Sequence, residues 1–530
     1  MSAIITDQFR ILNASTFIDN FVGAASTQNI FYTFIGLSNP TNTYSGGIPN
    51  WNDNPPPPLD NFYEENTYRP TILSLKKVNS GDVTRVIRKV KWESGRTYEM
   101  YKPDYSIDKK SPITDASSVY DCDYIVINSN YKVYICLNNG QNPENPSGQP
   151  SVDEPDFTDL DPRSAGISGD GYIWKYLYTL SPQEIIKFDS VNYIPVPDNW
   201  GESGESLSIK NNAVLGEVQI ALINRAGIGY PSNTTWTNVP ILGDGYGGKA
   251  TITVDSSGKV SSVTITNPGS KYTIANIQFE PGAPGSEEGG PLNGLVNVGV
   301  GTSAIANFEV ITSPKGGHGY DIYRETGAYR VMVFSNFSNS VDNPDFLTGN
   351  DFSRIGIIKN PTTYGSQTTL QTQSVVSGVG GIKFSGAGTT TTNYAGDDLI
   401  SQTVGVGSTA YGYVVSYDKI TGVLKYYQPI GLASSTYGYN IYRFTGTPGV
   451  GGTTVINGAL TGSDLFIDTT FTATQTQINN RTYKLGLSFV NGVANPEIDP
   501  ISGDVLYVDN RVAIPRSATQ TEDIRIVVEF

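Results

Sequence analysis

The sequence predicts a mainly β, multidomain protein of antiparallel β-sandwiches with long loops, a short N-terminal helix and inserted β-modules. Only 16% of its 530 residues are charged, while glycine, proline and tyrosine number 57, 31 and 33. This balance is poor in helix formers and rich in residues typical of strands and turns. Short runs of alternating apolar residues recur along the chain, and its length predicts roughly three to four domains.

The N-terminal region contains the clearest helical pattern of the chain. Large apolar side chains recur at helical spacing over residues 7–21, as Phe9, Leu12, Phe17 and Phe21. The preceding Thr6-Asp7 pair offers a cap, so a helix is predicted here.

A strand over residues 29–36 and then a long loop are predicted next. Residues 37–60 include the unbroken proline run from Pro55 to Pro58, which favours an extended polyproline segment over regular structure. A long ordered loop of this kind either contacts a partner or wraps its own domain.

The clearest β-hairpin lies within residues 121–137. If its turn is centred on Ser129, Cys122 and Cys136 face each other across the two strands. Two reduced cysteines packed as small hydrophobic side chains are the preferred interpretation. A disulfide or a metal-binding pair is the alternative.

Two later regions differ in composition from the rest. Residues 216–315 are rich in glycine, threonine and valine, and glycine–tyrosine motifs begin at Gly227, Gly269 and Gly317. The motifs predict a degenerate repeat of hairpin units, because glycine permits tight turns. Residues 363–494 are again rich in threonine, glycine and serine and are predicted to form a second inserted β-domain.

The C-terminal residues have the alternation of a half-buried strand. The apolar positions are Ile524, Ile526, Val528 and Phe530. Residues 505–508 predict an earlier strand, and residues 509–511 with Pro515 predict a break between the two. We therefore expect a docked tail that closes the molecule.

Five segments of the chain follow one another in a recognisable order. They are residues 6–10 with 29–34, residues 169–177, residues 192–197, residues 351–361 and residues 502–530. Taken in this order, they resemble the baseplate wedge proteins of T-even-like contractile-tailed bacteriophages, specifically the wedge subunit that is built as a homodimer. The resemblance covers about the first 215 residues, a piece near 316–362 and the tail after about 495.

The resemblance, together with the composition, divides the chain into five parts. Residues 1–215 form the wedge core with the helix, the proline-rich loop and a β-sandwich, and residues 216–315 form the inserted glycine–tyrosine module. Residues 316–362 return to the core, and residues 363–494 form the second inserted domain. Residues 495–530 supply strands that close the core.

The resemblance implies a structural subunit of the virion's tail baseplate, assembled in the host cytoplasm, with no catalytic step. It implies a homodimer that contacts other wedge subunits during tail assembly and contraction. Candidate interface residues lie in the tail, the proline-rich loop and the one basic cluster, at Arg511, Arg516, Gln520, Pro55, Pro58, Arg85 and Lys89. Ordinary packing within the chain, or a polar sheet face for the basic cluster, is the alternative.

Few residues suggest chemistry, and no cofactor, metal or small-molecule substrate is predicted. The single histidine, His318, lies in a glycine-rich turn with no acid or nucleophile at motif distance. Residues 243–248 match G-x-G-x-x-G by letter, but no helix pattern follows to bind a phosphate. The acidic run over residues 153–161 is interpreted as a solvated loop, with a calcium site as the alternative.

Charge and hydropathy exclude further classes of partner. A formal net charge of −15 argues against nucleic-acid binding, which needs a basic surface. No apolar run approaches the roughly 18 residues of a membrane helix, and we expect no membrane insertion. Two cysteines and the absence of an export signal favour synthesis in a cytoplasm.

Two other functions remain open from the sequence. A receptor- or carbohydrate-binding tail protein is the alternative suggested by the tyrosines and the glycine- and threonine-rich insertions. A polysaccharide-degrading tail enzyme would need two carboxylates that converge only in the fold.

Overall fold

The mainly β fold class is confirmed in the computed structural model, in which strands make up 40% and helices 11% of the residues that the structure describes. Most of the sheets are antiparallel, as their registers show. The structure describes residues 4–22, 29–38, 51, 53–279, 305–338, 351–386, 394–428, 442–458, 465–515 and 520–530.

The chain forms two compact units. The first unit contains residues 1–16, 84–332 and 527–530, and the second contains residues 17–83 and 333–526. The boundaries fall within four elements, which are α1 (Asp7–Val22), β3 (Val83–Arg88), β15 (Arg330–Ser338) and β28 (Thr521–Glu529). Each unit is therefore built from segments far apart in the sequence.

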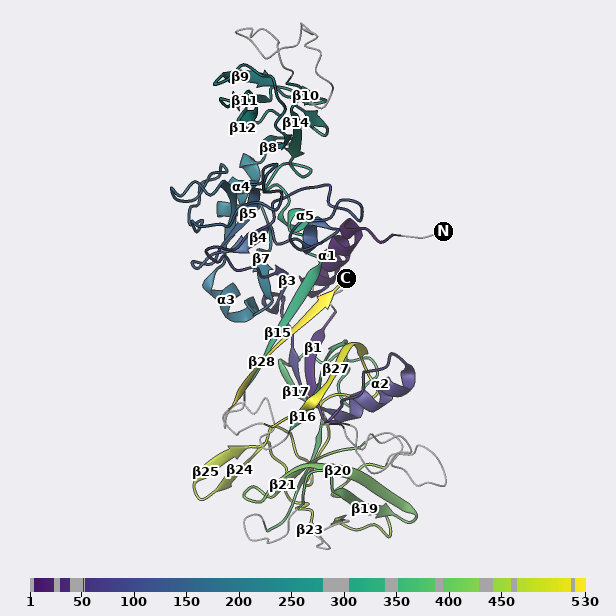
Figure 1. Ribbon diagram of the computed structural model, residues 1–530. Helices are drawn as coiled ribbons and strands as arrows, with labels where there is room; N and C mark the ends of the chain where they lie inside the picture. Colours follow the sequence, from purple (N-terminus) through teal and green to yellow (C-terminus); the bar gives the residue numbers. More distant parts are fainter. Residues whose placement is uncertain are drawn as a thin grey trace. The chain divides into compact units, whose positions relative to one another are not determined.

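The core of the first unit is an aromatic three-stranded sheet with the order β4-β5-β6. Figure 1 labels two of its strands, β4 and β5. Its strands are β4 (Ile125–Ile127), β5 (Lys132–Asn139) and β6 (Tyr172–Thr179). Trp174 of β6 is fully buried, and its ring packs against those of Tyr98 and Tyr172. Large aromatic side chains thus supply most of the buried surface here.

A second sheet has the order β28-β15-β3-β7, where β3 is Val83–Arg88 and β7 is Tyr193–Val196. Short helices connect the strands of the first unit, and each begins after a polar residue that can cap it. They are the 3-10 helix η3 (Val119–Asp121), α3 (Pro182–Phe188), α4 (Gly204–Asn212) and α5 (Ile322–Glu325).

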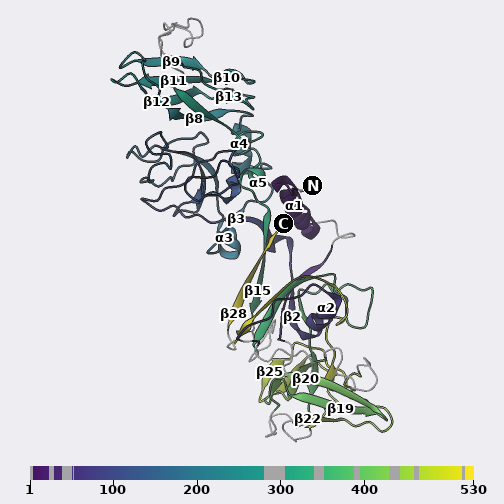
Figure 2. The ribbon, with the colours of Figure 1, turned by 45° about the vertical axis from the view of Figure 1, so that its right-hand side comes forward.

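Within the first unit, residues 218–308 include a separate hydrophobic cluster of their own. Tyr230 and Phe279 stack at its centre, and the Tyr230 hydroxyl donates to the Phe279 carbonyl. Figure 2 shows its strands grouped together. They are β8 (Val218–Arg225), β9 (Thr235–Pro240), β10 (Leu242–Gly243), β11 (Lys249–Val254), β12 (Val260–Asn267), β13 (Ala275–Asn276) and β14 (Asn307–Thr312).

The second unit contains a five-stranded sheet with the order β17-β2-β1-β16-β27. Strands from opposite ends of the chain are neighbours, since β16 pairs with β1 on one side and with β27 on the other. The strands are β1 (Phe31–Gly36), β2 (Ile72–Lys77), β16 (Phe352–Lys359), β17 (Val375–Ser377) and β27 (Asp504–Ile514). Helix α2 (Phe62–Tyr68) precedes β2, and the 3-10 helices η1 (Arg69–Thr71) and η2 (Ser80–Asp82) flank that strand.

The remainder of the second unit is a seven-stranded sheet with the order β23-β22-β19-β20-β21-β18-β26 and a two-stranded hairpin, β24-β25. The side chains of these strands form most of a hydrophobic cluster that draws only on residues 382–493. The strands are β18 (Gly380–Lys383), β19 (Leu399–Gly405), β20 (Ser408–Asp418), β21 (Val423–Tyr427), β22 (Val455–Gly458), β23 (Leu465–Phe466), β24 (Gln475–Ile478), β25 (Arg481–Lys484) and β26 (Val493–Ala494).

The predicted N-terminal helix is confirmed as α1, and the Thr6 side chain accepts a hydrogen bond from the Phe9 amide. The predicted apolar face is only partly correct. Phe9 and Leu12 are 52% and 59% exposed, whereas Ile18 and Phe21 are buried. The buried stripe of this helix is therefore shorter than the spacing of apolar residues suggested.

The hairpin of β4 and β5 exists, but its predicted register is wrong. Asn128 bonds to Lys132, and Tyr131 takes a positive φ of 59°, so the loop holds three residues centred on Asn130. The longer loop shifts the pairing, and the Cys136 amide donates to the Tyr124 carbonyl. The two cysteines are therefore not opposite each other, and both are free thiols, which agrees with the preferred interpretation.

The two tail strands are confirmed, but the break predicted at residues 509–511 is wrong. Strand β27 continues through these residues to Ile514, with shifts in its register against β16. The Asn510 side chain accepts from Arg354 and donates to the Pro56 carbonyl. These long-range contacts hold residues 509–511 in an extended conformation, although their sequence is typical of a turn.

Candidate interaction surfaces

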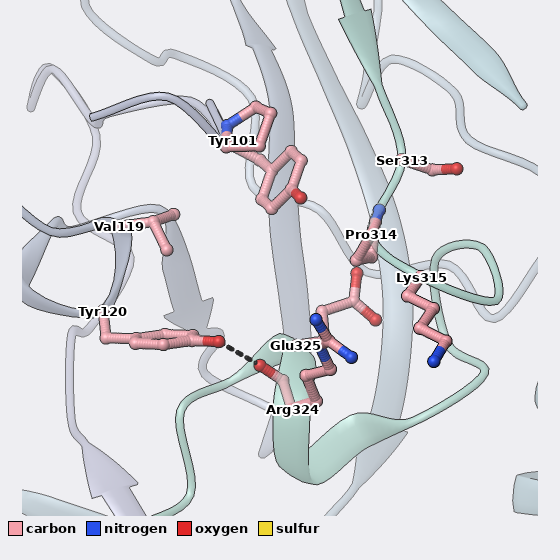
Figure 3. A pocket seen from close by; sticks show the side chains of 9 residues that line it. Tyr101, Val119, Tyr120, Ser313, Pro314, Lys315, Arg324 and Glu325 are labelled. Carbon is pink, nitrogen blue, oxygen red and sulfur yellow. Dashed lines mark hydrogen bonds between the residues drawn. The ribbon is translucent and has the colours of Figure 1, made fainter. Parts of the chain in front are cut away.

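The described part of the first unit contains a polar pocket of about 300 Å³ (Figure 3). Four chain segments meet there, and the loop that follows β14 and helix α5 supply the charged side chains. The lining residues are Tyr101, Pro103, Val119, Tyr120, Ser313, Pro314, Lys315, Arg324 and Glu325.

The polypeptide around the pocket is held by close backbone contacts. Gly317 has a φ of +98°, and a Cβ atom there would lie 2.5 Å from the Val214 carbonyl oxygen. Glycine is therefore required for this loop to approach residue 214. On the other side, the Tyr120 hydroxyl donates to the Arg324 carbonyl over 2.7 Å, which fixes the end of helix α5 (Figure 3).

A buried acid–histidine pair lies behind the pocket wall. His318 and Glu325 are 2% and 3% exposed, and His318 Nδ1 lies 2.6 Å from Glu325 Oε1. The other carboxylate oxygen, Oε2, accepts from the Gly319 amide over 2.6 Å. His318 lies in the glycine-rich turn as interpreted, and the short helix α5 returns Glu325 to that turn, a contact that no motif spacing in the sequence indicates.

The pocket also presents two basic side chains, those of Lys315 and Arg324. Neither side chain forms a hydrogen bond or ion pair with any residue that the structure describes. The one acid of the wall, Glu325, directs both of its oxygens to His318 and Gly319. The wall therefore has two cations and one carboxylate that is already hydrogen-bonded.

The two tyrosines of the pocket are held in their neutral form. Burial, and after it the Glu325 carboxylate, raise the pKa of Tyr101. Burial raises the pKa of Tyr120 to about 12. A neutral phenol can donate one hydrogen bond, and the Tyr101 hydroxyl has no partner among the described residues. Figure 3 shows the Tyr101 ring directed toward the wall that carries Arg324 and Glu325.

The sequence contains only a weak signal for this pocket. Lys315 and Arg324 stand nine positions apart in an unremarkable loop and helix, and Tyr101 and Tyr120 come from a region some 200 residues earlier in the chain. The one local signal is Asp321, whose side chain caps α5 by accepting from the Arg324 amide. Sequence reasoning missed the site because its walls meet only in the fold.

The basic interface candidates Arg85 and Lys89 each form an ion pair within the first unit. Arg85 pairs with Asp198 and stacks on the Tyr323 ring, with its guanidinium carbon 4.1 Å from the ring centroid. Lys89 Nζ lies 2.5 Å from Asp189 Oδ1. The Arg85 residue is 7% exposed and the Lys89 side chain 8%, so both charges are neutralised inside the chain.

The proline-rich segment and the tail lie together within the second unit. Trp51 Nε1 donates to the Arg511 carbonyl over 2.7 Å, and Asn510 Nδ2 donates to the Pro56 carbonyl over 3.0 Å. Arg69 of η1 donates to the Gly503 carbonyl over 2.8 Å. Because β27 is an edge strand, these contacts cover polar groups that would otherwise be open to another chain.

The remaining interface candidates differ in exposure. Pro58, Arg511 and Gln520 are exposed, and Pro55 is half-buried. Arg511 forms an ion pair with Asp509 on the same strand. Arg516 lies outside the described residues. A role of these residues in contacts between subunits remains a prediction.

Two sequence motifs have structural roles. The G-x-G-x-x-G match at residues 243–248 leads directly into strand β11. Carboxylates of the acidic run accept hydrogen bonds from neighbouring loops, as Asp153 does from Ser168 and Glu154 from Ser129. Among the described residues there is no group of three side chains that could hold a metal ion.

The chain matches no model of a known protein family, and no curated protein sequence matches it. In the part of the chain that the structure describes, no helix is both long and apolar enough to cross a membrane.

Proposed function

We propose that the chain is a structural subunit of the baseplate wedge of a contractile phage tail, which acts through protein–protein interfaces in tail assembly and contraction. It is a homodimer that contacts other wedge subunits, and it has no catalytic step. The proposal starts from the resemblance of five segments to the homodimeric wedge protein.

The observation that carries this proposal is where those segments lie. Residues 29–34, 351–361 and 502–530 are far apart in the sequence, yet they contribute the adjacent strands β1, β16 and β27 of one sheet. Within the first unit, residues 169–177 contribute most of β6 in the aromatic core, and residues 192–197 contain β7. If the chain shares its scaffold with the wedge proteins, the segments that resemble them should lie together in the fold. The segments that form β1, β16 and β27 do so as neighbours in one sheet.

The exposure of the tyrosines favours this function over a carbohydrate-binding tail protein. Sugar sites present aromatic rings to solvent, whereas most described tyrosines are buried or half-buried. Among the described tyrosines, those with more than a third of their surface exposed are Tyr131, Tyr246, Tyr320 and Tyr442. The abundance of tyrosine is thus explained mainly by packing.

Cryo-electron microscopy of the tailed particle that carries this chain tests the proposal. We expect density for two copies per wedge in the distal plate of the tail. Light scattering of the purified chain should report a dimer, and a panel of polysaccharides should remain uncleaved. A position away from the baseplate, or depolymerisation of a polysaccharide, would refute the proposed function.

A further inference from the structure

The pocket between α5 and η3 has the features of a site for an acidic group. Its volume of about 300 Å³ is at the lower end of the range for ligand clefts, about 300 to 1,000 Å³. That space holds a small polar group and not an extended apolar ligand. The nature of the ligand therefore depends on the polar side chains of the wall.

Three donors of the wall have no partner among the described residues. They are the Arg324 guanidinium, the Lys315 ammonium group and the Tyr101 hydroxyl. Their donors are complementary to an oxygen anion, and arginine in particular matches a carboxylate with two parallel hydrogen bonds. The main chain of α5 is held by the Tyr120 hydroxyl, which fixes the base of the Arg324 side chain before any ligand arrives.

The charge of the wall discriminates between anions. Glu325 adds one fixed carboxylate to the wall, whereas Lys315 and Arg324 add two positive charges. The charged side chains of the wall therefore carry one more positive than negative charge. A second negative charge on the ligand would be repelled by Glu325, which favours a monoanion such as a carboxylate over a phosphate dianion. The Lys315 side chain is exposed at the rim and can be reached by a residue of another protein.

We propose that this pocket binds a carboxylate side chain of a partner polypeptide, held by Arg324 and Lys315 with Tyr101 as a neutral donor. The identity of the ligand as a protein side chain rests on the proposed structural function, whereas the preference for a carboxylate rests on the pocket alone. An aspartate or glutamate inserted there anchors a neighbouring subunit through one desolvated, charge-assisted contact.

The first test measures binding of a fluorescent glycine-rich peptide with a single glutamate to the purified full-length chain, with the same peptide carrying glutamine in its place and inorganic phosphate for comparison. We expect the glutamate peptide to bind, with an affinity that falls as salt rises from 50 to 500 mM. The double variant Arg324→Gln/Lys315→Gln should bind at least 10-fold more weakly. The matched control Lys259→Gln/Arg481→Gln removes two charges elsewhere and should bind like the wild type.

Several outcomes of this assay would overturn the proposal. They are no binding of the glutamate peptide, equal binding by the double variant, and displacement of the peptide by phosphate at equal or lower concentration. Equal binding of the glutamine peptide would also overturn it. Thermal melts of each variant show whether it is folded, and Tyr101→Phe, which keeps the ring, gives a second variant that should weaken binding several-fold.

Carbodiimide coupling in the assembled particle tests the source of the carboxylate. This reagent joins an amine directly to a carboxylate that contacts it, and mass spectrometry should find Lys315 joined to an Asp or Glu of another polypeptide. Coupling of Lys315 only to residues of its own chain would refute a partner as the source. The peptide assay needs no particle, so failure of the pocket and failure of the proposed baseplate function are distinguishable.

Discussion

Trp51 should be the anchor that holds the proline-rich segment against the tail. Its side chain is 5% exposed, and its Nε1 donates to the Arg511 carbonyl of β27. The Arg354 guanidinium carbon lies 5.5 Å from its ring centroid. A Trp51→Ala substitution removes the packing, the hydrogen bond and the cation–π contact at once.

The expected loss of stability follows from these contacts. Truncating a buried tryptophan to alanine costs about 3–5 kcal/mol, which already includes its local contacts. Trp51→Phe keeps a ring but loses the hydrogen bond and some contact area, for about 1–2 kcal/mol. For a unit of this size each kcal/mol lowers Tm by about 2–4 °C, so we expect decreases of about 6–20 °C and 2–8 °C.

Differential scanning calorimetry of the wild type and both variants measures these shifts. Leu59→Ala is the matched control, because Leu59 lies in the same segment and is 56% exposed, and its Tm should stay within about 1 °C of the wild type. Hydrogen exchange should show faster exchange of β27 amides in Trp51→Ala. A folded Trp51→Ala protein with an unchanged Tm and unchanged β27 exchange would show that this reasoning is wrong.

Three further predictions concern packing, thiol reactivity and pH. Gly356→Ala should destabilise the β16–β27 pair by several kcal/mol, because a Cβ atom there would lie 2.3 Å from a backbone oxygen, whereas Gly81→Ala meets nothing within 4 Å and should be neutral in urea unfolding. Burial raises the pKa of the Cys122 thiol to about 12, so neither cysteine should react with Ellman's reagent until the chain unfolds, and a fast-reacting native thiol would contradict the burial. The Thr273 hydroxyl and nearby amides hold the pKa of Asp244 at about 2, below its unfolded value near 4. Its stabilising contribution is thus present above pH 4 and lost as pH falls through 2, and an Asp244→Asn variant should lose this part of the acid dependence of stability.

The sequence alone determined the class of the fold and several local elements. Alternating apolar residues and the scarcity of helix formers predicted a mainly β chain, and the apolar spacing of residues 7–21 predicted α1. These features depend on neighbours in sequence, where backbone geometry and side-chain periodicity act directly. The same local reasoning placed a hairpin around residue 129.

The register of the hairpin and the length of the tail strand depended on single residues, whose conformation the sequence leaves open. The hairpin register changed because Tyr131 adopts a positive φ, a conformation that is uncommon for tyrosine. The tail did not break at residues 509–511, because Arg354 and Pro56 bind Asn510 from elsewhere in the sequence. In the tail, tertiary contacts outweighed a weak local preference.

The candidate pocket was decided only by the tertiary structure. Tyr101, Tyr120, Lys315 and Arg324 become neighbours because two regions of the chain about 200 residues apart, each supplying two segments, pack together, and no local periodicity encodes such a meeting. His318 acquired its acid partner within a short stretch of chain, since the four-residue helix α5 turns Glu325, seven positions later, back toward it. Local patterns fix which residues form strands and helices, whereas long-range packing fixes which side chains meet and therefore what the surface can bind.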